Sequence, residues 1–249
     1  MNYFFSISNK FLKTKLTIPQ FRNDGFCDES YVPFKATIKD KKWEIEVAKF
    51  EYNNHFFIID DKELKNDCIF FLNKNFNKNR ILENRLVKYN SYTDTIPEFR
   101  ANLKIKLRNG GFSSYQSEYP YQMATKLGSI VSPLSALTNV NSEQNFLFIK
   151  NIFYKPIKET FNLYFIDIKN EKIVYKTECL TNYTNEIVVK NSFIKPNIYI
   201  YTQKYICIPM FVSISDKQVS FEHTHPPQLY LLSKEKFKII SKIKNKINE

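Results

Sequence analysis

One short segment of the chain concentrates side chains suited to holding a polar ligand. Three of the four glycines in the 249 residues stand at positions 110, 111 and 128, and glycine is favoured where the backbone needs a positive φ or a close approach. Tyrosine offers a large amphipathic surface at low entropic cost, while serine and glutamine add adaptable hydrogen bonds. The residues predicted to bind a ligand in and beside this segment are Arg100, Tyr115, Gln116, Ser117, Glu118, Tyr119, Tyr121 and Lys126.

This pattern predicts a loop that binds a carbohydrate or another polar small molecule, since loops carry binding sites more often than cores do. Arg100 and Lys126 would then be available to an anionic group on the ligand. The alternative is a hairpin turn at Asn109-Gly110, followed by an edge strand and a loop whose tyrosines pack against the sheet.

A pair of histidines gives a second candidate site. His223 and His225 follow a strand-like run, and side chains two apart on a strand point to the same face. The two imidazoles are therefore candidate ligands for a divalent transition metal, with a third ligand from elsewhere in the chain. The alternative is a pair of strand-end histidines held by hydrogen bonds beside a rigid Pro-Pro turn. The simplest expectation for the whole chain is that it uses no cofactor.

Sequence motifs for common catalytic machinery are missing. The chain contains no G-x-S-x-G elbow, no P-loop, no G-x-G-x-x-G and no H-E-x-x-H. The first functional hypothesis is therefore a non-enzymatic module that binds a carbohydrate or other polar ligand. The alternative is a metal-dependent enzyme that acts on a sugar or small metabolite through His223 and His225, and whether the protein is an enzyme stays open.

The strongly basic composition has two interpretations. The formal net charge is +12 and the isoelectric point is near 9.3, which fits a nucleic acid or an anionic surface as partner. However, the enrichment of Lys, Asn, Ile, Phe and Tyr is typical of an AT-rich genome, and arginine, the better residue for phosphate and base recognition, is scarce. Nucleic-acid binding is accordingly a second alternative. No basic leader or long apolar run is present, so we expect no transmembrane span and a cytoplasmic location.

Alternating apolar residues predict a mainly β protein. Three segments place Asp or Asn turn residues between such runs and predict hairpins at 38–43, 168–173 and 214–219. Asn109-Gly110 predicts a fourth. Further strands are predicted at 43–50, 55–59, 68–72, 146–153, 161–168, 173–177, 198–201, 206–214, 219–223 and 229–232. Many short strands with turns between them favour an antiparallel β-sandwich of jelly-roll or immunoglobulin-like type.

Two segments have helical periodicity. One covers residues 79–89, and the other runs from a possible N-cap at Ser233 to the C-terminus as an amphipathic helix with an isoleucine stripe and a lysine face. A polar, turn-prone stretch before Pro97 predicts a boundary. Residues 1–95 would form a small mixed α/β region and residues 96–249 the β-sandwich with its C-terminal helix, although a single continuous domain is the alternative.

Overall fold

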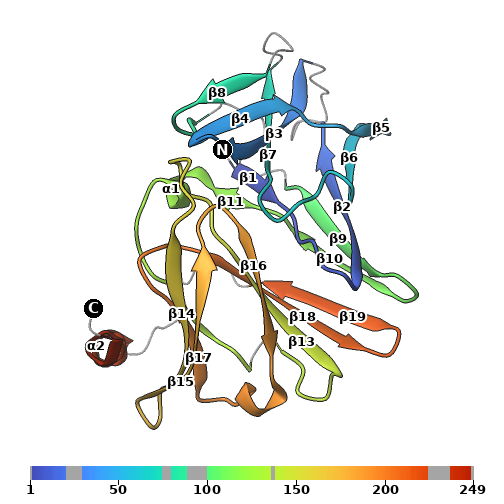
Figure 1. Ribbon diagram of the computed structural model, residues 1–249. Coiled ribbons are helices and arrows are strands. Elements are labelled where there is room, and N and C mark those ends of the chain that lie inside the picture. The colour runs from blue at the N-terminus through green and yellow to red at the C-terminus, as the bar shows by residue number, and fades with distance from the viewer. Residues whose placement is uncertain are drawn as a thin grey trace.

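The structure is a computed structural model in which residues 2–20, 30–74, 80–88, 100–135, 138–223 and 236–247 are described. Their strands form four antiparallel sheets, named I to IV below. Sheets I and II are built from the first half of the chain and sheets III and IV from the second, as the colours of Figure 1 show.

The first eleven strands are divided between sheets I and II. Their orders are β11-β1-β7-β3-β4-β8 and β10-β9-β2-β6-β5. The strands are β1 (Asn2–Phe5), β2 (Leu12–Pro19), β3 (Tyr31–Lys39), β4 (Lys42–Val47), β5 (Glu51–Asn53), β6 (Phe56–Asp60), β7 (Ile69–Lys74), β8 (Ile81–Glu83), β9 (Asn102–Leu107), β10 (Phe112–Gln116) and β11 (Tyr119–Pro120).

Sheets III and IV follow. Their orders are β12-β17-β14-β15 and β16-β13-β18-β19. The elements are β12 (Val131–Pro133), β13 (Gln144–Lys150), β14 (Thr160–Asp167), β15 (Lys172–Leu180), β16 (Thr184–Val189), the 3₁₀ turn η2 (Asn191–Phe193), β17 (Ile198–Thr202), β18 (Ile208–Ser215) and β19 (Gln218–His223). The two α-helices are α1 (Tyr121–Ala124) and α2 (Lys236–Ile247).

The predicted two-sheet β-sandwich is wrong. Four small antiparallel sheets, arranged as four blades in the manner of a β-propeller, replace it. The blades are not built from consecutive strands, because β1 belongs to sheet I and β2 to sheet II, while β12 belongs to sheet III and β13 to sheet IV. The alternation of apolar residues indicates which face of a strand is buried but not which strands share a sheet, so it did not indicate the number of sheets.

The predicted α/β character of the N-terminal region is also wrong. Within its described residues the region before residue 95 contains strands β1 to β8 and no helix. A helix was predicted over 79–89, but the described residues 80–88 of this range form β8 and short irregular stretches. In β8, Glu83 pairs with Trp43 and Ile81 with Ile45 of β4. Tertiary pairing overrides a weak helical preference here. The boundary at 95/96 stays a prediction.

The hydrophobic core follows from strand periodicity in β13 and β18, the two central strands of sheet IV, which are buried on both faces. In β13, Phe146 and Phe148 contribute to a cluster shared with sheets I and II. Leu147 and Ile149, on the opposite face, contribute to a second cluster shared with sheet III. Because successive side chains on a strand alternate in direction, one strand supplies both cores.

The predicted hairpins are confirmed. They join β3 to β4, β14 to β15, β18 to β19 and β9 to β10. Asp40, Glu171 and Asp216 adopt positive φ angles of 50°, 50° and 49° in the first three turns. The predicted strands between 43 and 223 each overlap a strand of the structure, with ends that differ by up to three residues. The one predicted at 229–232 lies outside the described residues.

The C-terminal helix is confirmed as α2, and its predicted N-cap Ser233 lies outside the described residues. Ile243 is 4% exposed and packs against sheet III, so one face of the helix is docked. Neither helix in the described part of the chain is long and apolar enough to span a membrane.

Candidate ligand-binding site

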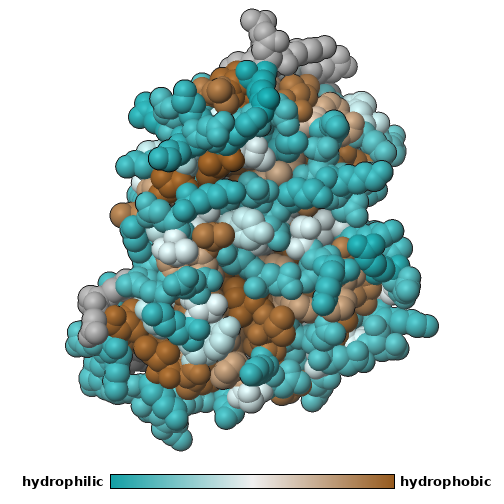
Figure 2. Space-filling model, viewed as in Figure 1, coloured by the Kyte–Doolittle hydropathy of each residue, from teal (hydrophilic) through white to brown (hydrophobic). Residues whose placement is uncertain are grey.

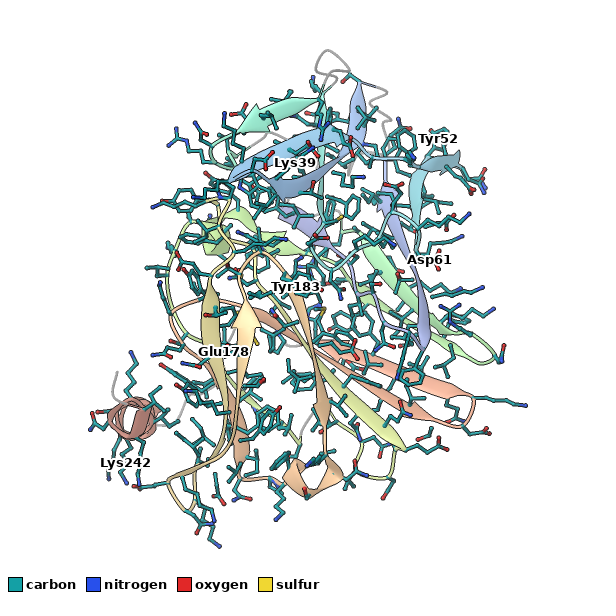
Figure 3. The ribbon with its side chains drawn as sticks, viewed as in Figure 1. Lys39, Tyr52, Asp61, Glu178, Tyr183 and Lys242 are labelled. Atoms are coloured by element: carbon teal, nitrogen blue, oxygen red, sulfur yellow. The ribbon has the colours of Figure 1, made fainter. Side chains whose placement is uncertain are left out.

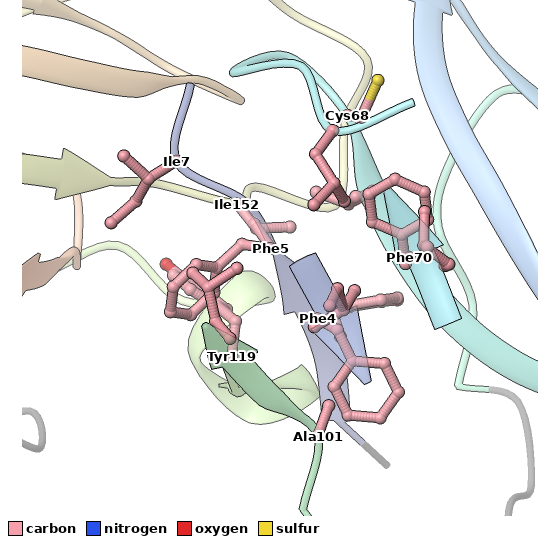
Figure 4. Packing of buried hydrophobic residues seen from close by; sticks show 14 of the residues in the cluster. Phe4, Phe5, Ile7, Cys68, Phe70, Ala101, Tyr119 and Ile152 are labelled. Carbon is pink, nitrogen blue, oxygen red and sulfur yellow. The ribbon is translucent and has the colours of Figure 1, made fainter. Parts of the chain in front are cut away.

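The segment between Gly110 and Gly128 is mostly regular structure rather than the predicted binding loop. It forms β10, β11 and α1, and β10 pairs with β9 as the alternative interpretation expects. Ser117 and Tyr119 are fully buried. Figure 4 shows Tyr119 among the apolar side chains Phe5 and Ile152.

The two buried hydroxyl groups satisfy backbone groups of neighbouring segments. Ser117 Oγ donates to the Phe5 carbonyl at 2.6 Å and accepts from the Phe5 N–H at 2.8 Å. Tyr119 donates to the Ile206 carbonyl at 2.8 Å, and burial raises the pKa of its phenol well above the usual value. Both side chains therefore tie β10 and β11 to the rest of the fold.

The clustered glycines are explained by close approach rather than by a positive φ. A Cβ at Gly110 would lie 2.7 Å from the Lys217 carbonyl oxygen, and one at Gly111 would lie 3.1 Å from it. At Gly128 a Cβ would lie 2.9 Å from Ile206 Cγ1. Glycine is needed at 110 and 111 because the β9–β10 turn meets the β18–β19 turn there.

Three of the predicted ligand-binding residues do converge. The Arg100 guanidinium forms an ion pair with Glu118 at 3.3 Å and a hydrogen bond with Gln116. These groups bind one another at the end of β10. Tyr121 lies elsewhere, 6.2 Å from Tyr3 between ring centroids, and Lys126 is exposed beyond α1.

The predicted histidine pair is only half described, because His225 lies outside the described residues. The His223 ring, 9% exposed, stacks edge-on against Tyr115 with the centroids 4.0 Å apart. No group of three or more His, Cys, Asp or Glu side chains that could hold a metal occurs among the residues that the structure describes. The metal site stays a prediction.

A different site, which the sequence did not suggest, is a groove of about 1060 Å³ beside the β3–β4 turn. Ligand pockets commonly measure about 300–1,000 Å³. The groove is formed by the β3–β4 turn, the stretch after β8 and the connection between β13 and β14. Its lining residues are Ile38, Asp40, Lys41, Asn84, Arg85, Tyr154, Lys155, Pro156, Ile157, Lys158 and Glu159.

Side chains of the turn between β15 and β16 hydrogen-bond to the backbone of the irregular wall of this groove. Asn182, 1% exposed, donates to the carbonyls of Lys155 and Ile157, both at 2.9 Å, and accepts from the Phe153 N–H at 2.7 Å. Thr181 adds a hydrogen bond to Ile157 O at 3.0 Å. Three backbone groups of this connection, the Phe153 N–H and the carbonyls of Lys155 and Ile157, thus have hydrogen-bond partners although the connection has no regular structure.

The opposite wall, formed by the β3–β4 turn and the stretch after β8, is joined to the β13–β14 connection by hydrogen bonds to one carbonyl. The Tyr154 carbonyl accepts from Trp43 Nε1 at 2.9 Å and from the Leu86 N–H at 2.8 Å. Tyr154 N–H in turn donates to the Ala124 carbonyl at 2.9 Å. The groove therefore lies where sheet I meets the second half of the chain.

Cations outnumber anions along the groove. Lys41, Arg85, Lys155 and Lys158 face two carboxylates, Asp40 and Glu159. Glu159 is already engaged, since it accepts from Tyr205 Oη at 2.7 Å and pairs with Lys204 at 3.0 Å. These two contacts lower the pKa of the Glu159 carboxyl. Lys158 forms an ion pair with Asp67 at 3.7 Å. Lys41, Arg85 and Lys155 are therefore the cations most available to a ligand.

The signal for this groove in the sequence is faint. The residues that shape it, Thr181 and Asn182, lie in a turn between two predicted strands and far from Lys155 in sequence. No family model, no curated protein and no solved structure matches the chain.

Proposed function

We propose that the protein is a non-enzymatic binding module for an acidic carbohydrate or a similar polar anion, and that the ligand occupies the groove beside the β3–β4 turn. The observation that carries the proposal is the combination of a preformed groove with an excess of cationic side chains. Preorganised backbone favours binding because less entropy is lost when the ligand arrives.

The lining suits a sugar in chemical terms. Tyr154, Pro156 and Ile157 supply apolar surface against which a pyranose ring can lie, while Asn84 and Asp40 offer hydrogen bonds to hydroxyl groups. Lys41, Arg85 and Lys155 surround this surface with positive charge. A uronate or sulfate group on the sugar would meet them, and an arginine can grip such a group through two N–H donors.

The first test measures binding of acidic oligosaccharides and of neutral oligosaccharides of equal length by calorimetry. We expect the acidic ligands to bind and the double variant Arg85→Gln/Lys155→Gln to lose about tenfold or more in affinity. The matched control is Lys13→Gln/Lys106→Gln, which removes the same charge from exposed positions on sheet II.

Two results would overturn the proposal. One is equal binding of acidic and neutral ligands. The other is an equal loss in the groove variant and in the sheet II variant, because that would show a general effect of net charge. A short DNA duplex serves as a comparison ligand, and preferential, steeply salt-dependent binding of DNA would favour a nucleic-acid role instead.

A further inference from the structure

A second cavity lies between the C-terminal helix and sheet III, far from the groove in sequence. Its volume is about 210 Å³. In Figure 1, α2 lies to one side of β14 and β15. The residues that line the cavity come from these three elements and the β14–β15 turn: Ile166, Ile168, Glu171, Lys172, Ile173, Lys238, Lys242, Ile243 and Lys246.

The inner part of this cavity is apolar. Ile166 and Ile243 are 3% and 4% exposed and belong to one buried cluster, against which Ile168 also packs. Ile173, from β15, is 39% exposed. In the space-filling view apolar surface borders the helix at the lower left (Figure 2). A ligand that enters here would contact branched aliphatic side chains.

The rim of the cavity is strongly cationic. Lys172, Lys238, Lys242 and Lys246 surround a single carboxylate, that of Glu171. Lys242, which projects from α2 in Figure 3, forms an ion pair with Glu171. Lys242, and more weakly Lys246 and Lys238, lower the pKa of the Glu171 carboxyl. The charge of Glu171 cannot balance four ammonium groups, so the rim has an excess of positive charge.

We propose that this cavity binds a small amphiphilic carboxylate, whose single ring or short alkyl chain contacts the isoleucines while its carboxylate group pairs with the lysines of α2. The size supports a small ligand, because a cavity of ~150 Å³ lined by aliphatic and aromatic side chains accommodates benzene. A volume of about 210 Å³ leaves room for one ring together with a charged group. The site is separate from the groove and does not depend on the function proposed for it.

The test uses the full chain with benzoate and hexanoate as probes and benzyl alcohol and hexanol as their uncharged counterparts. Titrations followed by amide NMR spectra should show the acids binding at millimolar concentrations or below, and the alcohols at least about fivefold more weakly. Lys238→Gln/Lys246→Gln should weaken binding of the acids about tenfold. The control is Lys244→Gln, which removes one charge from the same helix but outside the cavity lining and should change affinity less than twofold.

A second variant tests the apolar part independently of charge. Ile173→Phe adds volume to a half-exposed position on the cavity wall and should abolish binding without lowering the melting temperature by more than a few degrees. Lack of binding by both acids, equal binding of acids and alcohols, or equal losses in Lys244→Gln and in the double variant would overturn the proposal. The protein could instead bind phosphatidylglycerol vesicles but not the free acids, with equal losses on substitution of Lys238, Lys244 and Lys246. That result would also overturn the proposal and would indicate a membrane-binding surface.

Discussion

Gly111 donates its backbone N–H to the carbonyl oxygen of Lys217 at 2.6 Å. This bond joins the turn between β9 and β10 to the turn between β18 and β19, and so connects sheet II to sheet IV. The contact uses only backbone atoms of both residues. It therefore requires glycine in the β9–β10 turn, where a Cβ would be too close to the Lys217 carbonyl, but no particular side chain in the β18–β19 turn.

The first prediction concerns Gly110→Ala. The new Cβ would lie 2.7 Å from the Lys217 carbonyl and 3.0 Å from Leu107 Cδ1, so one of the two turns must shift. We expect a loss of about 1–3 kcal/mol in the free energy of unfolding, which is usual for overpacking, measured by urea denaturation. Lys217→Ala is the control, since it keeps the carbonyl and should change stability by less than about 0.5 kcal/mol. Equal effects of the two changes would contradict the backbone explanation.

The second prediction separates structural from ligand-binding roles in β10 and β11. Ser117→Ala removes a hydroxyl group that both donates to and accepts from Phe5, and we expect it to lower the free energy of unfolding by about 1–3 kcal/mol. Binding of acidic oligosaccharides to the groove should stay unchanged in this variant at a temperature where it is folded. If binding fell while stability held, Ser117 would instead contact the ligand.

The third prediction concerns the wall of the groove. Asn182→Asp keeps the acceptor for the Phe153 N–H but replaces the NH₂ group that donates to Lys155 and Ile157. A carboxylate oxygen would then face two carbonyl oxygens in a buried position, so we expect a loss of about 2–4 kcal/mol in the free energy of unfolding. The groove should also lose affinity for its ligand. Asn109→Asp, the same chemical change at an exposed turn, should be nearly neutral.

The fourth prediction concerns Asp167, which closes the β14–β15 turn. It accepts hydrogen bonds from the Asn170 N–H at 2.9 Å and from the side-chain amides of Asn170 and Asn197 at 2.8 and 2.6 Å. These bonds lower the pKa of the Asp167 carboxyl from 3.8 to about 2. A depressed folded-state pKa means that the unfolded chain binds the proton more readily. The carboxylate therefore adds to the free energy of unfolding, fully above about pH 4, and this stabilisation is lost as the pH falls towards 2.

Acid unfolding of Asp167→Asn tests this assignment. At neutral pH the variant should be less stable than the natural chain, and the difference should shrink between pH 4 and pH 2. A difference that stays constant over that range would show that the carboxylate does not titrate with folding.

The fifth prediction concerns Lys150, and its pH window lies on the alkaline side. This side chain is fully buried and donates to the carbonyls of Asn66 and Cys68 at 3.2 and 3.3 Å. Burial lowers the pKa of its ammonium group from 10.5 to about 7. Between these two values the unfolded chain holds a proton that the folded chain does not, so stability rises with pH in that window.

Comparison with Lys150→Met isolates this effect. The natural chain should gain at least about 1 kcal/mol of unfolding free energy relative to the variant between pH 7 and pH 10, because each pKa unit corresponds to about 1.4 kcal/mol. Lys49→Met, at a side chain that is 87% exposed, should show no such gain. Parallel pH profiles for Lys150→Met and the natural chain would refute the burial argument.

The sequence predicted features that depend on neighbouring residues and failed where distant pairing decides. The hairpins at Asp40, Asn170 and Asp216 follow from the local turn chemistry of Asp and Asn, and the isoleucine stripe of α2 follows from helical period. The strand at Ile81 was predicted as helix because its pairing with Ile45 has no local signal. The groove was missed for the same reason. Its wall is held by hydrogen bonds from Asn182 to the carbonyls of Lys155 and Ile157, and the connection that contains these two residues has no periodic pattern in the sequence.

The packing of the segment between Gly110 and Gly128 was predicted only in part. The glycine cluster did indicate close packing of the backbone, and Arg100, Gln116 and Glu118 do come together. The burial of Ser117 and Tyr119 could not be predicted, because the local sequence around a tyrosine does not show whether its side chain lies in a core or in a binding loop. Only the position of Phe5 and Ile206 relative to them distinguishes the two cases.

The alternation of strands between sheets has a consequence for synthesis on the ribosome. β1 pairs with β11 and β2 pairs with β9, so residues near the start of the chain find their partners about a hundred positions later. Chains dominated by such distant pairs fold slowly. While the nascent chain is shorter than about 120 residues, one edge of β1 and one edge of β2 are unpaired, and these edges are where we expect a chaperone or an unwanted second chain to attach.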